Sequence, residues 1–165
     1  MVNVDGVISG NYRSNISGTD INRQWQFPSK KGHPEVFWLK QEIGNNKKQT
    51  AFFLDIHAHS RKMNSFFYGS KMLSKENRLL PFICSKMNKF ISYAESAFTD
   101  DPSKKSTARV ILETEFSIPI SLTYEVSFYG WTDPVKQTNI SFKQADLRQM
   151  GESLGIGFYY SLIGM

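Results

Sequence analysis

The sequence of 165 residues has little cysteine, no long apolar run and no concentrated tract of one charge. Its single cysteine, Cys84, excludes a disulfide within the chain and a zinc site built from cysteines, so a reducing compartment is the default expectation. Nowhere do eighteen apolar residues follow one another, and the first ten residues lack the basic and apolar regions of a secretory signal. These absences favour a cytoplasmic protein with no membrane partner.

Positive charge is in excess, but it is spread along the chain. The formal net charge is +5, and the basic residues come as scattered pairs rather than as one tract. Such a balance is compatible with an acidic partner. Because neither an RNA-binding aromatic motif nor a Cys-His finger accompanies the pairs, we expect no nucleic acid partner.

The apolar content predicts a folded domain, and the sequence contains three predicted helices. Forty per cent of the residues are apolar, and the length suits one core. Residues 33–44 predict a helix with Pro34 in its first turn. Apolar residues at helical spacing predict a C-terminal helix after a capping box of Ser141 and Gln144, and a further helix is expected from near Pro81.

Four apolar runs predict β-strands, at residues 49–57, 64–70, 108–116 and 120–128. The first is almost continuously apolar, as in a strand that is covered on both faces. The first thirty residues are rich in turn residues, and only residues 1–4 are available there as the tail of a strand. The order of helices and strands predicts a layered α/β domain with part of its sheet missing.

Two groups of polar residues fall on the predicted strands. His57 and His59 lie near the end of an apolar strand, with Asp55 on the same face by the period of two. This arrangement predicts either a metal site or a pair of hydrogen-bonded histidines. Glu125 lies inside an apolar strand, so it is either a general base or the partner of a cation such as Arg109.

A third feature is the stretch GTDINRQWQFP at residues 18–28. Turns need Gly and Asp, but they make no demand on the Asn22-Arg23 pair that follows. The pair is therefore a candidate binding element.

Five separated motifs resemble, in order and approximate spacing, the zinc carboxypeptidases of the M14 type. They are NVDGVISGNYR, SGTDINRQW, FFLDIHAHSRKMNSFFYGS, STARV and LTYEVSFYG. They look most like the cytosolic carboxypeptidase branch, which trims glutamates from tubulin and other acidic tails. The resemblance implies a truncated, mixed-sheet α/β fold with helices on both faces, in which residues 1–165 form a single partial catalytic domain. It also implies acidic C-terminal tails as partners, and the cytoplasm, including the cytoskeleton or cilium, as the location.

The resemblance implies a role for five residues. Asn22 and Arg23 match the pair that binds the substrate's C-terminal carboxylate, and Arg13 matches the arginine that stabilises the oxyanion of the scissile carbonyl. His57 matches a zinc ligand, and Glu125 matches the general base that activates the zinc-bound water. His59 is then a supporting or structural group. Recognition of acidic side chains has three candidate cations, Arg61, Lys62 and Arg109.

The His-x-x-Glu motif that supplies the family's other two zinc ligands does not occur in these 165 residues. Because a catalytic zinc needs three protein ligands, the chain alone is expected to be inactive, and an upstream segment or a partner chain is expected to complete the zinc site and the sheet. Two alternatives stay open. The chain is either a non-catalytic protein that binds acidic tails through Arg13, Asn22 and Arg23, or a structural part of a larger, microtubule-associated assembly.

Overall fold

A computed structural model of the protein describes residues 1–71 and 75–163, and the side chains of residues 75–77 lie outside this description. The chain divides into two compact units. The first, the helical unit, comprises Met1–Phe53 and Asp100–Ile118, and the second, the sheet unit, comprises Leu54–Thr99 and Pro119–Met165. Each has its own hydrophobic core. The assignment of residues 1–165 to a single domain stays a prediction.

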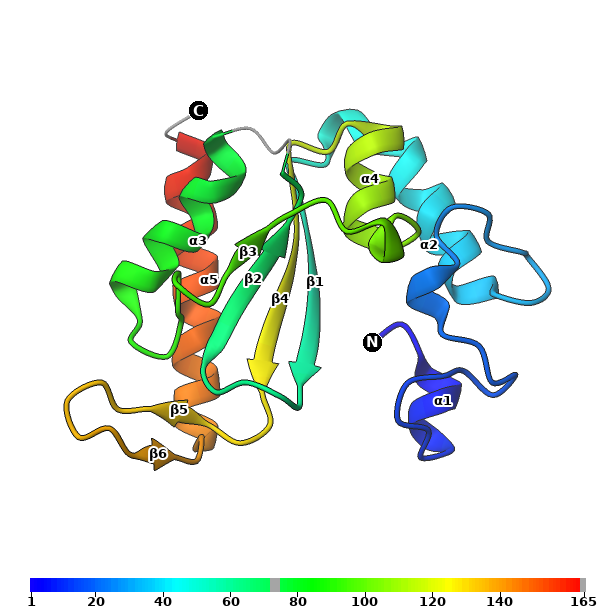
Figure 1. Cartoon of the computed structure of the whole chain (residues 1–165). Coiled ribbons are helices and arrows are strands. Elements are labelled where there is room, and N and C mark those ends of the chain that lie inside the picture. The colour runs from blue at the N-terminus through cyan, green and yellow to red at the C-terminus, as the bar shows by residue number, and fades with distance from the viewer. Residues whose placement is uncertain (72–74, 164–165) are drawn as a thin grey trace. The chain divides into compact units, whose positions relative to one another are not determined.

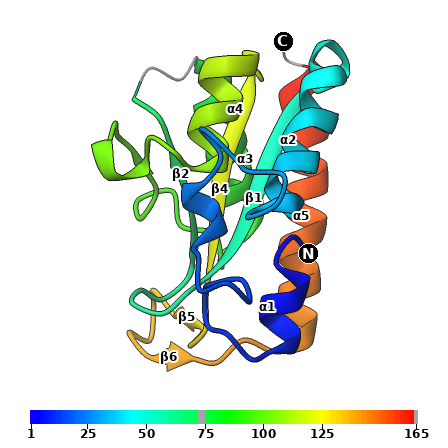
Figure 2. The ribbon, with the colours of Figure 1, turned by 90° about the vertical axis from the view of Figure 1, so that its right-hand side faces the viewer.

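The helical unit is built from short helices, and residues of η1, α2 and α4 pack with Trp25 in its core. Its elements are α1 (Val4–Ile8), η1 (Ile21–Arg23), α2 (Pro34–Asn45), η2 (Lys47–Gln49), η3 (Pro102–Lys104) and α4 (Ala108–Phe116). Val36 of α2 and Leu112 of α4 are fully buried, and Trp25 is 3% exposed between them. Figure 2 shows α2 and α4 as the two longest helices of this unit. The predicted helix at residues 33–44 is confirmed.

The sheet unit contains a four-stranded mixed sheet. Its strands are β1 (Phe52–His59), β2 (Ser65–Gly69), β3 (Ala97–Phe98) and β4 (Ile120–Ser127), in the order β1-β4-β2-β3. β2 pairs antiparallel with β4 and parallel with β3, and Figure 1 shows β1 and β4 running in the same direction. The predicted α/β class with a mixed sheet is confirmed.

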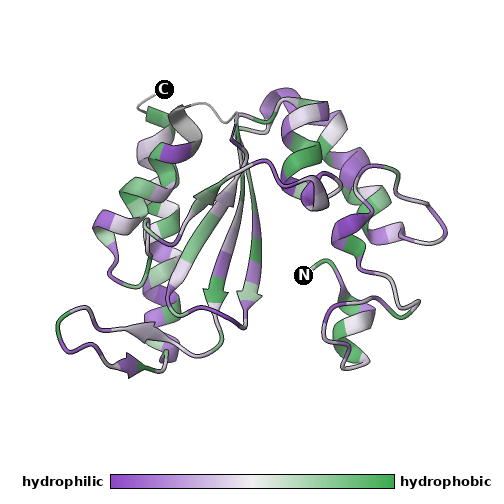
Figure 3. Cartoon of the chain, in the orientation of Figure 1, coloured by the Kyte–Doolittle hydropathy of each residue, from purple (hydrophilic) through white to green (hydrophobic). Residues whose placement is uncertain are grey.

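Two long helices cover one face of this sheet. α3 (Lys75–Met87) and α5 (Gln144–Ile163) pack together there, as Figure 1 shows, and a ribbon of β5 (Trp131–Thr132) and β6 (Asn139–Ile140) lies near the start of α5. The core between helices and sheet contains Phe67, Tyr124 and Leu154. Figure 3 shows hydrophobic residues, in green, along the strands of this sheet. Helices on the other face of the sheet stay a prediction.

The predicted strand at residues 108–116 is wrong, because this segment is the helix α4. Ala108, Ile111 and Leu112 are buried and three and four residues apart, which is helical spacing. The high β-propensity of Val110 and Ile111 concealed this period. Ser117 ends the helix with a left-handed φ of 58°.

Helix boundaries differ from the prediction at three more places. α3 begins at Lys75, so Pro81 lies inside it rather than at its start. α5 begins at Gln144 without Ser141 as its cap, because the carboxylate of Asp146 accepts the backbone N–H of Lys143 at 2.8 Å. Val4 belongs to α1 and not to the tail of a strand.

The strands predicted at residues 49–57, 64–70 and 120–128 are confirmed as β1, β2 and β4, but β1 differs in burial. None of the residues of β1 is buried, whereas most residues of β2 and β4 are. The expectation of coverage on both faces is thus wrong for β1, because this strand forms the edge of the sheet. In the part of the chain that is described, no helix is long and apolar enough to cross a membrane.

We expect Cys84 to be unreactive while the chain is folded. Its side chain is fully buried, and burial raises the pKa of the thiol to about 12, so the reactive thiolate is on the order of 10⁻⁴ of the population at pH 8. An aromatic disulfide reagent should label the chain only after urea unfolding. Rapid labelling in buffer would contradict the packing of α3 against α5.

Two glycines of α5 should respond in opposite ways to alanine. A Cβ at Gly157 would lie 2.5 Å from Cys84 Sγ and 3.1 Å from Leu80 Cδ1, so overpacking should cost about 1–3 kcal/mol. A Cβ at Gly155 meets nothing within 4 Å, and alanine there should stabilise the helix by up to about 1 kcal/mol. Urea denaturation of Gly157→Ala and Gly155→Ala measures both effects, and equal effects would contradict this helix orientation.

Candidate active site

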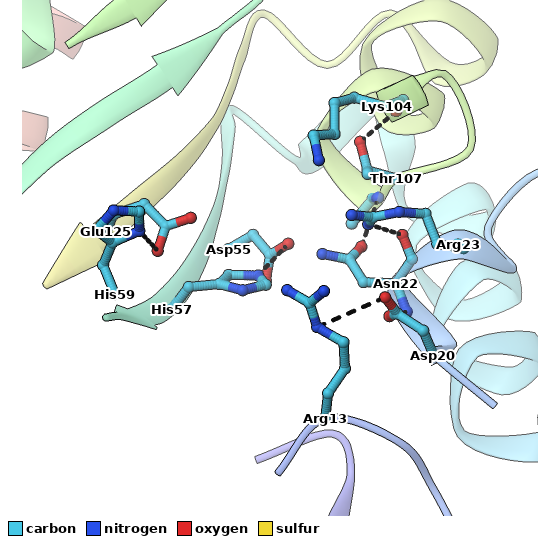
Figure 4. A network of polar contacts seen from close by, with 11 residues as sticks. Arg13, Asp20, Asn22, Arg23, Asp55, His57, His59, Lys104, Thr107 and Glu125 are labelled. Atoms are coloured by element: carbon cyan, nitrogen blue, oxygen red, sulfur yellow. Dashed lines mark hydrogen bonds and ion pairs between the residues drawn. The ribbon is translucent and has the colours of Figure 1, made fainter. Parts of the chain in front are cut away.

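The helical unit gathers Arg13, Asp20, Asn22 and Arg23, which we call the Asn-Arg cluster (Figure 4). The turn before it is fixed by the side-chain oxygen of Asn15, which accepts the backbone N–H groups of Ser17 and Thr19 at 3.0 Å each. Asp20 then caps η1 by accepting the N–H of Asn22 at 3.0 Å. The turn and cap hold the Asn-Arg pair on a short, ordered helix.

Asn22 has a structural contact that the sequence did not reveal. Its Oδ1 accepts the backbone N–H of Ala108 at 2.9 Å, at the first residue of α4. Thr107 is at the N-cap position of α4, but its side chain makes no capping hydrogen bond. Asn22, 86 residues away in the sequence, accepts a hydrogen bond from the N-terminus of α4 instead. The amide oxygen of Asn22 thus serves α4, and the NH₂ group is the donor of this side chain.

The two arginines of the cluster are placed differently. Arg23 Nη1 donates to the carbonyl of Asn22 at 3.0 Å, which folds its guanidinium back over η1. Arg13 Nε lies 3.7 Å from the carboxylate of Asp20, and the side chain of Arg13 is 62% exposed. An ion pair this exposed adds little stability, so the guanidinium of Arg13 keeps the ability to bind an anion. A planar fork of donors suits a carboxylate or an oxyanion.

In the sheet unit, Asp55 and His57 project from the same face of β1, as the period of two predicted. Asp55 Oδ2 lies 2.8 Å from His57 Nε2 (Figure 4). When Nε2 of a neutral imidazole carries the proton, Nδ1 is the acceptor, and a carboxylate on the far nitrogen is the usual support of a metal-binding histidine. The pair therefore fits the ligand role that the resemblance implies for His57.

Glu125 of β4 lies close to His59 of β1. Their Oε2 and Nδ1 atoms are 3.7 Å apart, and the side chain of Glu125 is 14% exposed (Figure 4). His59 also packs edge-on against Phe66, with ring centroids 5.0 Å apart. Burial lowers the pKa of His59, and the charges of Lys62 and Arg61 lower it further. The carboxylate is thus held in a half-buried setting beside a histidine.

The three cations proposed for recognising acidic side chains differ in their surroundings. Lys62 Nζ lies 2.9 Å from Glu95, whose hydrogen bond raises the pKa of this lysine. Arg61 is exposed, and Arg109 is buried in α4 of the helical unit. A role for any of them in specificity, and for Arg109 as a partner of Glu125, stays a prediction.

The residues present do not fit a complete zinc site. Among the described residues there is no group of three or more His, Cys, Asp or Glu side chains that could hold a metal ion. His57 with Asp55 fits one supported ligand, and a catalytic zinc needs three. The remaining ligands would have to come from outside these residues.

Comparison with known proteins finds close relatives among carboxypeptidases, although no family model matches the chain. The chain is 33% identical over 177 residues to human cytosolic carboxypeptidase 1, covering 95% of this chain and 14% of the relative. It is 32% identical over 175 residues to cytosolic carboxypeptidase 6 of Caenorhabditis elegans, covering 99% and 38%. The name of a relative from Plasmodium falciparum, 36% identical over 139 residues, includes the words "zinc carboxypeptidase". The chain spans well under half the length of these relatives.

Solved structures show the same fold. A metallo-carboxypeptidase from Burkholderia cenocepacia matches 99% of this chain with a TM-score of 0.81 and 20% identity, and the match covers 43% of that structure. A metallo-carboxypeptidase from Pseudomonas aeruginosa matches 93% of the chain with a TM-score of 0.76. The sequence relatives and the shared fold agree. The chain therefore belongs to the M14 metallocarboxypeptidases, in their cytosolic carboxypeptidase branch, and corresponds to a part of their length.

Proposed function

We propose that this chain supplies the substrate-binding and general-base parts of a zinc carboxypeptidase that removes C-terminal glutamates from acidic protein tails such as those of tubulin, in the cytoplasm. The observation that carries the proposal is the Asn-Arg cluster, in which a cap, a turn and the start of α4 hold Asn22 and Arg23 on η1. A generic loop has no need of this arrangement. An enzyme that recognises a chain end by its carboxylate does.

Each of the proposed residues has a chemical task. Asn22 and Arg23 bind the terminal carboxylate through N–H donors, and Arg13 stabilises negative charge on the oxygen of the scissile carbonyl. Glu125 takes a proton from the attacking water and passes it to the leaving amine. His57 offers one metal ligand, and the other ligands come from a segment outside these 165 residues. When bound, zinc would polarise the water and the carbonyl.

A second candidate is a non-catalytic protein that binds acidic tails with the same cluster. It uses the exposed guanidinium of Arg13 and the donors of Asn22 and Arg23, and it needs no metal ligand from this chain. A third is a structural role in a larger assembly, for which the eight-residue edge strand β1 is the supporting feature. Both predict binding or assembly without hydrolysis.

A chimaera separates the first candidate from the other two. The stretch of human cytosolic carboxypeptidase 1 that directly precedes its match to this chain is fused before Met1. We expect the fusion to bind one zinc ion and to release glutamate from a peptide that ends in several glutamates. The same stretch fused to a His57→Ala chain is the control and should lose zinc and activity. A well-folded fusion that stays metal-free and inactive would contradict the carboxypeptidase proposal and favour tail binding.

A further inference from the structure

The helical unit contains a pocket that none of the proposed catalytic residues lines. Its volume is about 580 Å³, within the range of sites that bind small molecules. The lining comes from the loop after η1, from α2 and η2, and from the end of α4. It consists of Gln26, Phe27, Pro28, Phe37, Lys40, Gln41, Gly44, Asn45, Lys47 and Phe116. We call it the α2 pocket.

Three aromatic rings form the walls of the α2 pocket. Phe27 lines the pocket and is 83% exposed, although Trp25, two residues before it, is buried, so a large apolar side chain is in contact with water there. Phe37 and Phe116 face the pocket from α2 and α4. Gly44 allows the close approach of these helices, because a Cβ there would lie 3.3 Å from the ring of Phe116.

Lys40 makes its polar contacts within the protein, so we do not expect it to be the cation that pairs with a ligand. Its Nζ donates to the carbonyls of Trp25 at 2.8 Å and Gln26 at 3.1 Å, and it lies 2.7 Å from the carboxylate of Glu115. These contacts tie the loop that carries Phe27 to both helices. The loop wall is thereby held in place before any ligand arrives, which lowers the entropy lost on binding.

Lys47 supplies a cation at the rim. It is exposed, and in the described part of the chain it takes part in no ion pair. The pocket therefore combines an apolar interior with one positive charge at its edge. The amides of Gln41 and Asn45 add hydrogen-bonding groups beside that charge.

We propose that the α2 pocket binds a small carboxylic acid with a flat aromatic or branched aliphatic body. The body lies between Phe27, Phe37 and Phe116, and the carboxylate pairs with Lys47. This proposal is separate from the carboxypeptidase function and does not depend on it, because the pocket and the Asn-Arg cluster share no residue.

The test is a titration of the full ¹⁵N-labelled chain with 2-naphthoate, followed by NMR. We expect saturable shifts in the amides of residues 26–27, 37–47 and 116, with a Kd on the order of 1 mM for a ligand of this size. The neutral 2-naphthamide should bind about threefold more weakly, since it lacks the ion pair with Lys47. This comparison needs no variant and so does not depend on how a variant folds.

Matched variants locate the two parts of the ligand. Phe27→Ser should raise the Kd about tenfold, whereas Ile8→Ser, which changes another exposed apolar residue of the same unit, should leave it unchanged. Lys47→Gln should raise the Kd for naphthoate about threefold and abolish the preference over naphthamide, with Lys48→Gln as the unchanged control. Shifts centred on other residues, equal binding of acid and amide, or no saturation by about 10 mM would overturn the proposal.

Discussion

Glu125→Gln in the fusion that supplies the missing ligands is expected to lower the rate of glutamate release by about 10²–10⁴-fold, the usual contribution of a general base. Glutamine keeps the shape of the side chain in its half-buried place beside His59, but it cannot accept a proton at neutral pH. The fold should be little changed, because glutamine has nearly the same size and shape as glutamate. Steady-state kinetics with a peptide that ends in glutamates measures the effect.

Glu152→Gln is the control for this prediction. Glu152 is exposed on α5, and its substitution removes the same charge from the surface. Activity should stay at the unsubstituted level. If Glu125→Gln and Glu152→Gln were equally active, Glu125 would be a structural carboxylate and the base would lie elsewhere.

Asn22→Asp should separate the two tasks of Asn22. An aspartate still has an oxygen that accepts the N–H of Ala108, and a negative charge at the start of α4 is favourable. The melting temperature should therefore stay close to that of the unsubstituted chain. Binding of a glutamate-ending peptide should fall at least about tenfold, because a hydrogen bond to a charged group, worth about 1.5–3 kcal/mol, is replaced by repulsion between carboxylates.

Asn22→Ala provides the matched comparison. It loses both the cap and the donor, so it should be less stable by about 1 kcal/mol as well as defective in binding. Thermal unfolding and fluorescence anisotropy with a labelled peptide distinguish the variants. Unchanged peptide binding by Asn22→Asp would show that Asn22 serves α4 alone.

The helices and strands that could be predicted from the sequence are those with clear local signals. α2 has Pro34 at its start, and β2 and β4 are apolar runs with β-branched and aromatic residues, so local rules suffice for them. The sequence of α4 suits a strand as well as a helix. Its burial depends on packing with Trp25 and α2, which are far away in the sequence. β3 is two residues long and carries no local signal.

The sequence proposes the residues of the candidate site and one of their partners, but not the contacts that depend on distant segments. The motifs around Arg13, Asn22, Arg23, His57 and Glu125 point to these positions, and the period of two placed Asp55 beside His57. The contact from Asn22 to Ala108 joins residues 86 positions apart, and the approach of Glu125 to His59 depends on the pairing of β1 with β4. Local patterns contain no information on such contacts, because tertiary packing creates them.

Recognition of a terminal carboxylate by the Asn-Arg cluster can be measured as the affinity of the 165-residue chain for one glutamate-ending peptide in two forms, with a free and with an amidated C-terminus. We expect the free acid to bind and amidation to weaken binding at least about tenfold, because the Asn-Arg cluster recognises the terminal carboxylate. Arg23→Gln should abolish this difference, and Arg148→Gln, at an exposed position on α5, should preserve it. Equal affinity for the two forms would contradict carboxylate recognition by the Asn-Arg cluster, whether or not the chain takes part in hydrolysis.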